Sequence, residues 1–439
     1  MTSQAPERQD LDFEVGQLTR VEGEGSLHLS VDAAGSVRAQ LRIFEAPRYF
    51  EQLVVGRTPD EVLDIVARIC GICPVAYQMS GVHAFESLFG VEVDPGVRLL
   101  RRLFYCGEWI ESHALHIFLL HAPDFLGYPS ALEMAADHRE VVERGLRMKK
   151  LGNRIVAMVG GRAIHPVSVR VGGFSRVPRV EELDELREPL REALADAEAT
   201  VALVAGLDTP VADREPRLVS LRHPDEYPMN DGRIVSSDGI DLAPGEWRDA
   251  FHEVQVPWSH ALQARAEDGV PYLLGPTARV VLAADQLHPR ARAALDATGL
   301  TPDDLRRNVF RSIVSRAVEL VHALAEASEI VAGYQRPARP AEPWQPREGV
   351  AAWATEAPRG LLFHRYELDA EGHIRSAQIV PPTSQNQAAI EHDLELFAPS
   401  VLDRSHEEAT LRFEQLIRSY DPCISCATHF LDLTVDRDR

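Results

Sequence analysis

Two Cys-x-x-Cys pairs near opposite ends of the chain constrain its fold more than any other feature. The first pair is Cys70 and Cys73, and the second is Cys423 and Cys426. The two-residue spacer lets both sulfurs of a pair face one point, so each pair alone is a two-thiolate clamp. If all four thiolates serve one site, the fold must bring the two ends of the chain together. The chain is then better interpreted as one domain than as two or three.

Three uses of four thiolates compete at this point. A structural zinc site is the commonest use of two such pairs, but zinc ribbons separate their pairs by roughly 15–20 residues. A redox disulfide would need only one pair. A catalytic site for nickel, iron or copper is equally compatible with soft sulfur ligands, and an open coordination position would make it reactive. The spacing alone leaves zinc and a catalytic metal open.

The composition indicates a globular protein with an ample core, since 45% of its 439 residues are hydrophobic and 26% are charged. The formal net charge of −21 argues against nucleic acid or an anionic membrane as a partner. Five cysteines, an odd number, indicate a reducing compartment rather than a disulfide framework. Neither a membrane span nor a signal peptide is visible, so we expect a cytoplasmic protein.

Hydrophobic periodicity predicts an α+β fold that is mostly α, a large helical body with small antiparallel sheets near both ends. Alternating residues predict one hairpin at 27–31 and 37–43 and another at 361–368 and 374–380. The middle of the chain shows only a short hairpin at 232–242 and a strand-like run at 278–283. Helices are expected at 77–89, 95–120, 131–159, 181–206, 285–298, 302–334, 385–397 and 407–419.

The residues that flank both cysteine pairs form longer motifs. These are RICGIC at 68–73 and DPCISCATH at 421–429. They resemble the two metal-binding signatures of the large, catalytic subunit of nickel–iron hydrogenases. Further matching stretches follow in the same order at 18–23, 50–51, 160–166, 356–360 and 380–386. The resemblance runs the length of the chain and implies that residues 1–429 form a single domain with the large-subunit fold of that family.

The resemblance implies a nickel–iron centre and a magnesium ion. Nickel would be held by four thiolates, those of Cys70, Cys73, Cys423 and Cys426. The second cysteine of each pair, Cys73 and Cys426, would also bridge to an iron that carries carbon monoxide and cyanide. In the family a magnesium ion lies near the C-terminal motif. Its ligands would be the side chains of Glu51 and His429 and the backbone carbonyl of Gln387.

The implied reaction is the reversible heterolytic cleavage of dihydrogen into protons and electrons. Dihydrogen is a very weak acid, so a metal must accept hydride while a base accepts the proton. By family likeness Cys423 is that base and Glu22 relays the proton outward. Arg359 would lie above the open metal position, fixed by Pro358 and Asp421. Without the family resemblance, each of these residues could equally be an ordinary surface or core residue. The alternatives to a hydrogenase are a zinc-stabilised structural protein or a non-catalytic relative of the same fold.

The implied partners follow from what the chain lacks. Only Cys106 remains beyond the four ligands, and we expect it in the core, so iron–sulfur clusters must belong to a small subunit. No dinucleotide fingerprint is present. Electrons would therefore pass through ferredoxin-like and flavin/NAD(P)-binding subunits. The stretch at 68–80 is most similar to the cytoplasmic, multisubunit, NADP-linked group. The family also uses metal-insertion chaperones and a maturation protease, which would remove residues 430–439.

Several residues depart from the family pattern or call for separate interpretation. Many relatives have a histidine where this chain has Tyr77. The oxygen-tolerant membrane enzymes of the family have an aspartate where this chain has Ser112. A run of histidines at roughly helical spacing is expected to form a polar stripe near the site or a core cluster. Its members are His113, His116 and His121.

Overall fold

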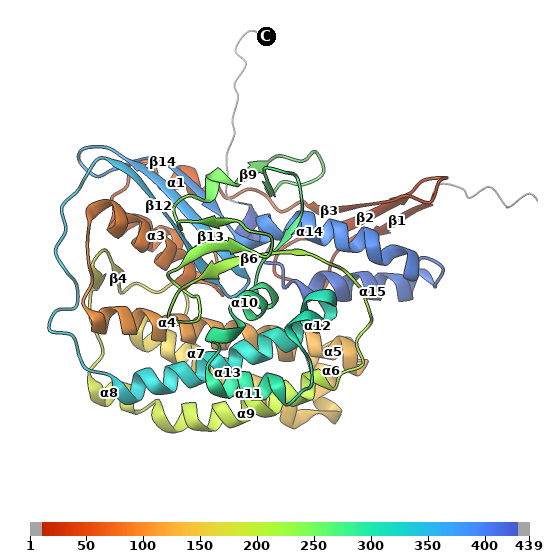
Figure 1. The fold of residues 1–439 in the computed structure, drawn as a ribbon, viewed down its shortest axis with the longest axis horizontal. Coiled ribbons are helices and arrows are strands. Elements are labelled where there is room, and N and C mark those ends of the chain that lie inside the picture. The colour runs from red at the N-terminus through yellow and green to blue at the C-terminus, as the bar shows by residue number, and fades with distance from the viewer. Residues whose placement is uncertain (1–10, 429–439) are drawn as a thin grey trace, which may run out of the picture.

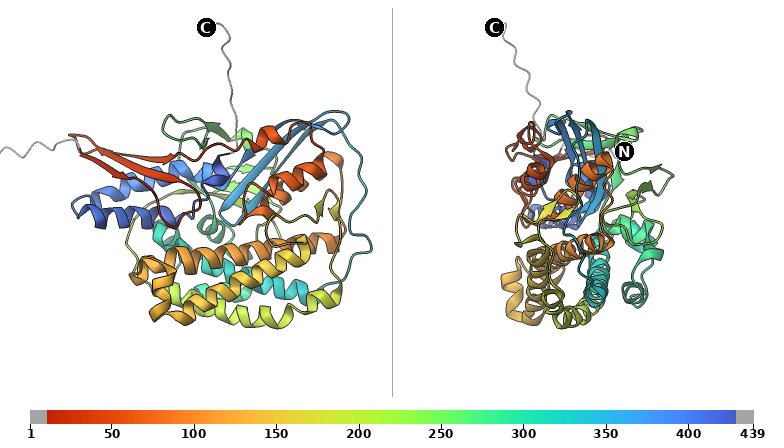
Figure 2. Two further views of the ribbon diagram at one scale, coloured as in Figure 1. Left: turned by 180° about the vertical axis from the view of Figure 1, so that it is seen from behind. Right: turned by 90° about the vertical axis from the view of Figure 1, so that its left-hand side faces the viewer.

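The structure is a computed structural model that describes residues 11–428. Long helices form one half of the molecule and most strands lie in the other half, as three views show (Figures 1 and 2). The helical half is built mainly from α4 (Pro95–Leu115), α7 (Arg139–Gly160), α9 (Arg187–Ala205) and α13 (Ser312–Gly333). The prediction of a mostly helical chain with small antiparallel sheets is therefore confirmed. None of the described helices is both long enough and apolar enough to cross a membrane.

Shorter helices complete the framework. They are α1 (Phe50–Leu53), α2 (Pro59–Val66), α3 (Pro74–Phe89), α5 (Ala122–Leu126), α6 (Ala131–Asp137), α8 (Val180–Asp184), α10 (Pro276–Leu282), α11 (Pro289–Asp296), α12 (Pro302–Arg307), α14 (Pro382–Phe397) and α15 (His406–Ser419). Many begin at a proline, whose fixed φ suits the first helical turn. Before α4, the Asp94 carboxylate accepts a hydrogen bond from the N–H of Gly96 at 2.7 Å, which caps the helix.

Several predicted helices are interrupted. The stretch 131–159 breaks at His138, where the backbone is non-helical, and 302–334 breaks at Asn308, whose side chain caps a 3₁₀ turn. The stretch 181–206 divides into α8 and α9, and 95–120 continues beyond α4 as a π-helix, His116–His121. Pro189, in the first turn of α9, marks the break between α8 and α9, because a proline cannot donate the hydrogen bond that would continue the helix. No glycine or proline lies at the breaks at His138 and Asn308. In contrast, Pro289 explains why α11 begins there and not at 285, because the residue before a proline avoids the helical region.

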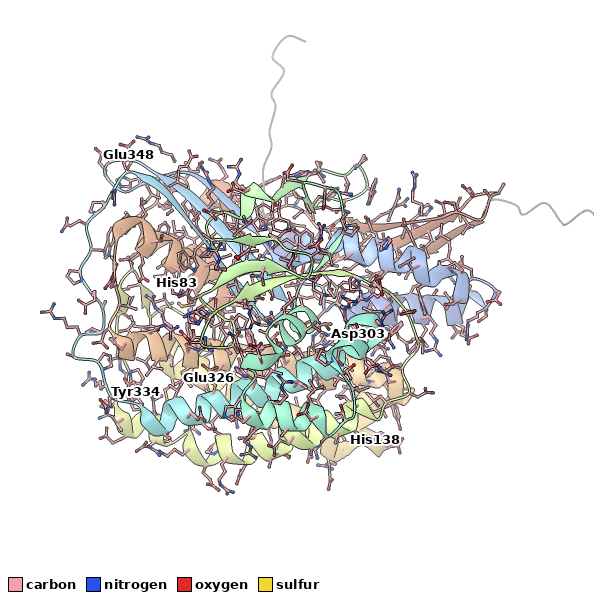
Figure 3. The ribbon with its side chains drawn as sticks, viewed as in Figure 1. His83, His138, Asp303, Glu326, Tyr334 and Glu348 are labelled. Carbon is pink, nitrogen blue, oxygen red and sulfur yellow. The ribbon has the colours of Figure 1, made fainter. Side chains whose placement is uncertain are left out.

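Two glycines let α4 and α7 approach closely. A Cβ added at Gly152 would lie 2.5 Å from the carbonyl oxygen of Gly107, and one added at Gly107 would lie 2.9 Å from the side chain of Ile155. Side chains fill the rest of the helical half. In Figure 3, Glu326 on α13 lies within the body, whereas the exposed Glu348 lies at its edge.

The first sheet joins the two ends of the chain. It has the order β1 (Leu11–Val15), β2 (Gly25–Val31), β3 (Val37–Ile43), all antiparallel, so the predicted hairpin is confirmed and β1 is added to it. Its apolar face packs on α14 and α15 in one core cluster. The backbone N–H of Leu41 also donates to the carboxylate of Glu391 on α14 at 2.9 Å. This packing brings the segment after β1 beside the segment after α15.

The second hairpin prediction is confirmed and also extended. The sheet consists of β12 (Gly349–Ala357), β13 (Gly360–Leu368) and β14 (Ile374–Val380). Ala357 pairs with Gly360, so Pro358 and Arg359 are the two residues at the hairpin tip. Gly360 has a φ of 132°, which favours glycine and allows this sharp reversal.

A further sheet lies in the middle of the chain. Its order is β11 (Tyr272–Leu273), β6 (Arg217–Arg222), β7 (Arg233–Ser236), β8 (Asp241–Leu242), with β11 parallel to β6. The short hairpin at 232–242 is thus confirmed. Two-stranded pairs are β4 (Val169–Arg170) with β5 (Gly173–Phe174) and β9 (Phe251–Val254) with β10 (Gln263–Ala266).

The strand predicted at 278–283 is wrong, because these residues belong to the buried helix α10. Two adjacent valines gave the run its strand-like pattern. Gly275, with a φ of 97°, and Pro276 at the first helical position start a helix there instead.

Candidate metal centre

Four buried sulfur atoms from opposite ends of the chain converge on one point. The Sγ of Cys70 lies 3.6 Å from that of Cys423, and the Sγ of Cys73 lies 3.8 Å from that of Cys426. All four sulfurs lie within 4.8 Å of one another. Within residues 11–428, no other group of three or more histidine, cysteine or carboxylate side chains gathers in this way. The donor set is soft and buried, which fits nickel and iron as well as zinc.

The first pair is held by the start of α3. Cys73 precedes Pro74, the first helical residue, and the chain turns tightly before it. As a result, the backbone N–H groups of Ile72 and Cys73 donate to the Sγ of Cys70 at 3.3 and 3.2 Å. Such hydrogen bonds favour the thiolate form, which is the form that binds a metal.

The second pair lies on a turn that the N-terminal segment supports. The backbone N–H of Ile424 donates to the carbonyl of Glu22 at 2.9 Å, and Glu22 and Cys423 form an isolated β-bridge. The backbone N–H of Cys423 donates to the hydroxyl of Thr383 at 3.0 Å. A 3₁₀ turn, Ser425–Ala427, then places Cys426 beside Cys423, with their sulfurs 2.8 Å apart.

The Arg48 side chain links the two cysteine pairs, a contact that no sequence pattern predicted. Its guanidinium donates to the carbonyl of Ile69 at 2.7 Å and to the carbonyl of Ser425, so one side chain bridges both cysteine loops. Its backbone N–H also donates to the carbonyl of Thr428 at 2.7 Å. Arginine is abundant in this chain, so only its position three residues before Glu51 could have drawn attention to it.

Glu22 lies between the second pair and solvent. Its Oε2 atom is 3.1 Å from the Sγ of Cys423 and accepts the backbone N–H of Ser425 at 3.1 Å. The side chain is half-buried. The hydroxyl of Ser425 in turn donates to the carboxylate of Glu45 at 2.8 Å. A proton that leaves Cys423 therefore has a carboxylate within hydrogen-bond reach on the path outward.

Arg359 extends from the β12–β13 tip toward the second cysteine loop. Its Nε donates to the carbonyl of Asp421 at 2.9 Å and its Nη2 to the carboxylate of Asp421 at 3.2 Å. Burial alone would lower the pKa of Arg359. Asp421 and the thiols of Cys423, Cys73 and Cys70 nevertheless raise this pKa well above its ordinary value. A buried, permanently charged guanidinium thus lies beside the sulfurs, and its Nη1 has no hydrogen-bond partner among the described residues.

The four thiols influence one another's protonation. Burial raises the pKa of the Cys70 thiol, but contacts with the other sulfurs and the charge of Arg359 bring it well below its ordinary value. The pKa of Cys423 is raised well above its ordinary value, first by contact with Cys426 and then by contact with Cys70. Without a cation, the cluster therefore favours one thiolate among neighbouring thiols, and a soft cation would displace the remaining protons.

The structure places only part of the expected magnesium site. Glu51 lies in α1, and its Oε1 accepts the backbone N–H of Ile379 at 2.7 Å. Burial and the nearby carboxylate of Glu253 raise the pKa of Glu51 to about 8, and burial raises the pKa of Glu253 to about 7. Two buried carboxylates of this kind fit a hard cation. Gln387 is buried in α14, and His429 lies outside the described residues.

Two members of the histidine stripe, His116 and His121, pack against the segment that leads to the second cysteine pair, and His113 contacts α13. The three side chains are buried on α4 and the π-helix that follows it. Each Nε2 atom has one hydrogen-bond partner 2.7–3.2 Å away. These partners are, in chain order of the histidines, the carboxylate of Glu319, the carbonyl of Arg418 and the hydroxyl of Ser419. The stripe therefore supports the chain beside the site and does not gather into a metal site of its own. Cys106, on α4, is fully buried, as expected of a core residue.

Comparisons with known proteins agree with this geometry. The sequence profile of the nickel-dependent hydrogenases matches residues 48–145 and 258–429, more than half of the chain and both cysteine pairs. The chain is 32% identical over 429 residues to the alpha subunit of sulfhydrogenase 1 from Pyrococcus furiosus, and the match covers 96% of this chain and 99% of that protein. It is 33% identical over 428 residues to the alpha subunit of sulfhydrogenase 2 from the same organism, with 96% of this chain and 100% of that protein covered.

Solved structures show the same fold. An NAD+-reducing [NiFe]-hydrogenase in the H2-reduced state superposes with a TM-score of 0.86 at 26% identity, covering 95% of this chain and 99% of that one. The Ni-Fe-Se hydrogenase of D. vulgaris Hildenborough gives a TM-score of 0.78 at 22% identity, covering 96% of this chain and 100% of that one. The second likeness concerns the fold alone.

Proposed function

The chain belongs to the nickel-dependent hydrogenases, in the role of their catalytic large subunit, and from this premise we propose how its own residues take part in cleaving dihydrogen. The observation that carries the proposal is the convergence of four buried sulfurs within 4.8 Å beside the Arg359 guanidinium and the Glu22 carboxylate. A zinc-stabilised structural protein would need the sulfurs alone. A non-catalytic relative would not need the four thiolates.

The four cysteines would hold nickel, and Cys73 and Cys426 would share their sulfurs with iron. When bound, such a centre supplies a hydride acceptor. Cys423 then acts as the base that takes the proton of dihydrogen, and Glu22, 3.1 Å away, receives that proton and passes it toward solvent. Arg359 places a fixed positive charge beside the reacting position, and Asp421 holds that charge in place.

Two further cofactor assignments belong to the same proposal. Iron would carry carbon monoxide and cyanide, as the family resemblance implies, and no side chain supplies these two ligands. Glu51, the carbonyl of Gln387 and His429 would hold magnesium. The support within the described residues is the buried carboxylate of Glu51, which lies near that of Glu253.

Electrons must leave through partner proteins. The only cysteine beyond the four ligands is Cys106, which is buried in α4, so the chain has no cysteines to hold an iron–sulfur cluster. We propose that the first acceptor is an iron–sulfur small subunit, followed by ferredoxin-like and flavin/NAD(P)-binding subunits in a cytoplasmic heteromultimer. The structural similarity to an NAD+-reducing enzyme supports coupling to a pyridine nucleotide.

Residues 430–439 lie outside the described residues and are proposed to be a maturation tail. After chaperones insert the metals, a protease would cleave after His429 and leave residues 1–429 as the mature domain. The intact mass of the purified active enzyme tests this. A mass that includes FLDLTVDRDR would contradict the cleavage without affecting the assignment of the four thiolates.

The function itself is tested on the purified complex by elemental analysis, infrared spectroscopy and hydrogen uptake with an artificial electron acceptor. We expect nickel and iron at about one atom each per chain, infrared bands of carbon monoxide and cyanide, and hydrogen uptake. Zinc as the sole metal, with no hydrogen uptake, would contradict the proposal.

A further inference from the structure

A second buried arginine holds the turn that carries Arg359. Pro358 and Arg359 form the tip between β12 and β13. The Nη1 of Arg279 donates to the carbonyl of Ala357 at 2.9 Å, and its Nη2 donates to the carbonyl of Pro358 at 2.9 Å. One guanidinium thus fixes the two peptide groups that immediately precede Arg359.

All five N–H groups of Arg279 have partners. Besides the two carbonyls, its Nε and Nη2 donate to the two carboxylate oxygens of Glu319 at 2.7 Å each, and its Nη1 donates to Glu356 at 2.8 Å. The guanidinium also lies 4.3 Å from the centre of the Trp109 ring. The side chains of Arg279, Glu319 and Glu356 have no exposed surface. Only arginine offers five donors in a planar fork, so lysine cannot reproduce this set of contacts.

The two carboxylates that orient Arg279 are themselves fixed. Glu356, on β12, accepts the backbone N–H of Leu221 on β6 at 2.7 Å. Glu319, on α13, accepts the hydroxyl of Tyr227 at 2.8 Å and lies 2.9 Å from the Nε2 of His113. The position of Arg279 is therefore tied both to a sheet and to the helical half of the molecule.

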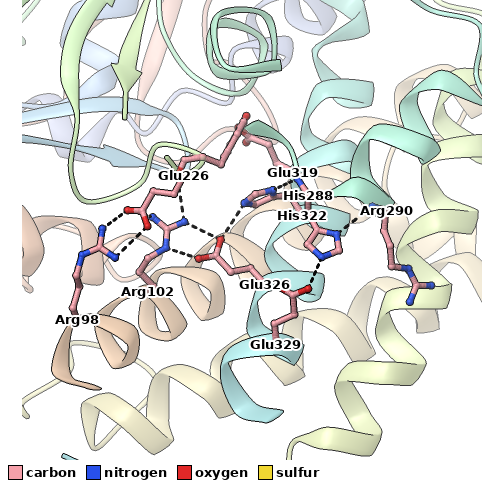
Figure 4. A network of polar contacts seen from close by, with 10 residues as sticks. Arg98, Arg102, Glu226, His288, Arg290, Glu319, His322, Glu326 and Glu329 are labelled. Carbon is pink, nitrogen blue, oxygen red and sulfur yellow. Dashed lines mark hydrogen bonds and ion pairs between the residues drawn. The ribbon is translucent and has the colours of Figure 1, made fainter. Parts of the chain in front are cut away.

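The contacts of Tyr227 lead from Glu319 to a polar network that includes Arg102 and Glu326 (Figure 4). The carbonyl of Tyr227 accepts the Nη2 of Arg102 at 3.2 Å. Arg102 also pairs with Glu326, whose carboxylate lies 3.1 Å from the Nε2 of His322. Arg102 lies on α4, and Glu326 and His322 lie on α13, so these contacts join the two long helices. They also hold the loop residue Tyr227, whose hydroxyl donates to Glu319.

The Arg359 side chain has far fewer contacts of its own. Asp421 is its hydrogen-bond partner, and Nη1 has none among the residues the structure describes. The backbone of Arg359, in contrast, packs closely against Gly275. A Cβ added at Gly275, just before α10, would lie 2.7 Å from the carbonyl oxygen of Arg359. The α10 segment that contains Gly275 and Arg279 therefore fixes the backbone from which the Arg359 side chain extends, and Asp421 holds the far end of that side chain.

We propose that Arg279 is a positioning residue for the hydrogenase reaction, which acts by holding the Ala357–Pro358 carbonyls and thereby the Arg359 guanidinium beside the metal centre. This inference rests on the proposed function, because it assigns a role to a residue behind the reacting one. Arg279 touches neither the four sulfurs nor the reacting position in any described contact. It should therefore affect turnover only through Arg359.

The test uses the purified complex with Arg279→Lys. We expect nickel and iron contents equal to those of the wild type and a fall in kcat of about 10- to 100-fold, the cost of misplacing a catalytic group by about 1 Å. KM for dihydrogen should stay within about twofold, because transition-state and not ground-state contacts are lost. The nickel electron paramagnetic resonance spectrum should shift in the same direction as in Arg359→Lys. In the double variant, Arg279→Lys should reduce kcat less than about twofold beyond Arg359→Lys alone.

Arg101→Lys is the matched control. Arg101 is equally buried and pairs with both carboxylate oxygens of Glu86 at 2.6 and 2.7 Å, but it contacts nothing near Arg359. It should lower thermal stability without changing kcat or the nickel spectrum. If Arg279→Lys fails to take up metal, Glu356→Gln serves as the second test of the positioning role. Glutamine retains the shape of the side chain but loses the negative charge that binds Arg279. That variant should lower kcat several-fold with the same spectral shift.

The outcomes separate this inference from the function on which it rests. An inactive wild-type complex that contains only zinc would contradict the function. An active wild type with an Arg279→Lys variant of unchanged kcat and spectrum would overturn the positioning role alone. Additive losses in the double variant would also overturn it, because they would show that Arg279 acts by a route other than Arg359.

Discussion

The Sγ of Cys423 lies 3.1 Å from the Oε2 of Glu22, although 401 residues separate them in the sequence. The same two segments share a main-chain hydrogen bond from Ile424 to the carbonyl of Glu22 at 2.9 Å. The contact is therefore built into the backbone and does not depend on a flexible side chain alone. On the proposed function, it gives a proton one short step from the Cys423 sulfur to a half-buried carboxylate.

Glu22→Gln should slow proton transfer without disturbing the metal site. Glutamine retains the oxygen that accepts the N–H of Ser425 but cannot carry a proton. We expect hydrogen uptake to fall by about 10²- to 10⁴-fold, with nickel and iron contents unchanged. Glu24→Gln, at the exposed carboxylate two residues on, is the control and should keep wild-type activity. Wild-type uptake in Glu22→Gln would exclude Glu22 as the relay.

Cys426→Ser should abolish retention of both metals and hydrogen uptake, because a serine oxygen is a poor substitute for a bridging thiolate. Elemental analysis of the purified variant measures this directly. Cys106→Ser changes an equally buried cysteine that lies on α4, outside the sulfur cluster, and should retain nickel and iron. Full metal content in Cys426→Ser would refute the ligand assignment.

Arg48→Met should weaken metal binding although Arg48 binds no metal. It removes the hydrogen bonds that connect the carbonyls of Ile69 and Ser425, so the two cysteine loops lose their shared support. Loss of such supporting contacts typically lowers metal affinity by about 10- to 100-fold, which competition with a chelator measures. Arg68→Met changes an exposed arginine two residues before Cys70 that pairs with Asp64, and it should leave affinity unchanged.

Stability should decrease as the pH falls below about 6.5, the ordinary pKa of histidine. Burial lowers the pKa of His116 and His121 well below that value, and the nearby cation of Arg316 lowers it further. In this range the unfolded chain takes up protons at these two histidines and the folded protein does not. Each contributes about 1.4 kcal/mol per pH unit to the loss, until the folded-state pKa is reached.

The measurement is the denaturant midpoint of the complex between about pH 7.5 and 5. These two histidines contribute to the slope of the denaturant midpoint against pH. In His121→Gln their contribution should fall by about half, since glutamine takes up no proton in either the folded or the unfolded state. His121 lies beside His116, with ring centres 5.0 Å apart, so His116→Gln should give a comparable reduction. A slope that is the same in all three proteins would contradict the assignment.

Gly152→Ala should destabilise the protein by forcing α4 and α7 apart. The added methyl group would lie 2.5 Å from the carbonyl of Gly107, and a backbone atom cannot move aside cheaply. We expect a loss of roughly 1–3 kcal/mol, typical of overpacking, in thermal or denaturant unfolding. Gly333→Ala, at the end of α13 where an added Cβ meets nothing within 4 Å, should be neutral or slightly stabilising.

The sequence predicted elements whose pattern is local. Alternation predicted β2, β3, β13 and β14, and long periodic stretches predicted the main helices. It missed β12, because the alanine-rich segment Gly349–Ala357 becomes a strand through its pairing with β13. It assigned α10 to the wrong class, because two valines outweighed the proline at its start. Tertiary contacts decide such segments, and no local pattern encodes them.

The residues of the candidate site likewise fall into those that the sequence predicted and those that it did not. The four cysteines were visible because cysteine is scarce in this chain and because two Cys-x-x-Cys pairs have the spacing typical of metal ligands. Glu22 and Arg359 were identified only through the motifs around them. Arg48, Glu253 and Arg279 were not identified. Arginine and glutamate are common here, and the importance of these three depends on partners that lie far away in the sequence.

The placement of the two cysteine pairs also governs the order of events during synthesis. Cys423 is made 353 residues after Cys70, which corresponds to about 18–70 s at roughly 5–20 residues per second. Throughout that interval the nascent chain offers one two-thiolate clamp without its complement. A metal that binds early meets half a site, and two thiolates also suit zinc. On the proposed function, a four-thiolate site can therefore be completed only after Cys426 has been made, and the first pair needs protection until then.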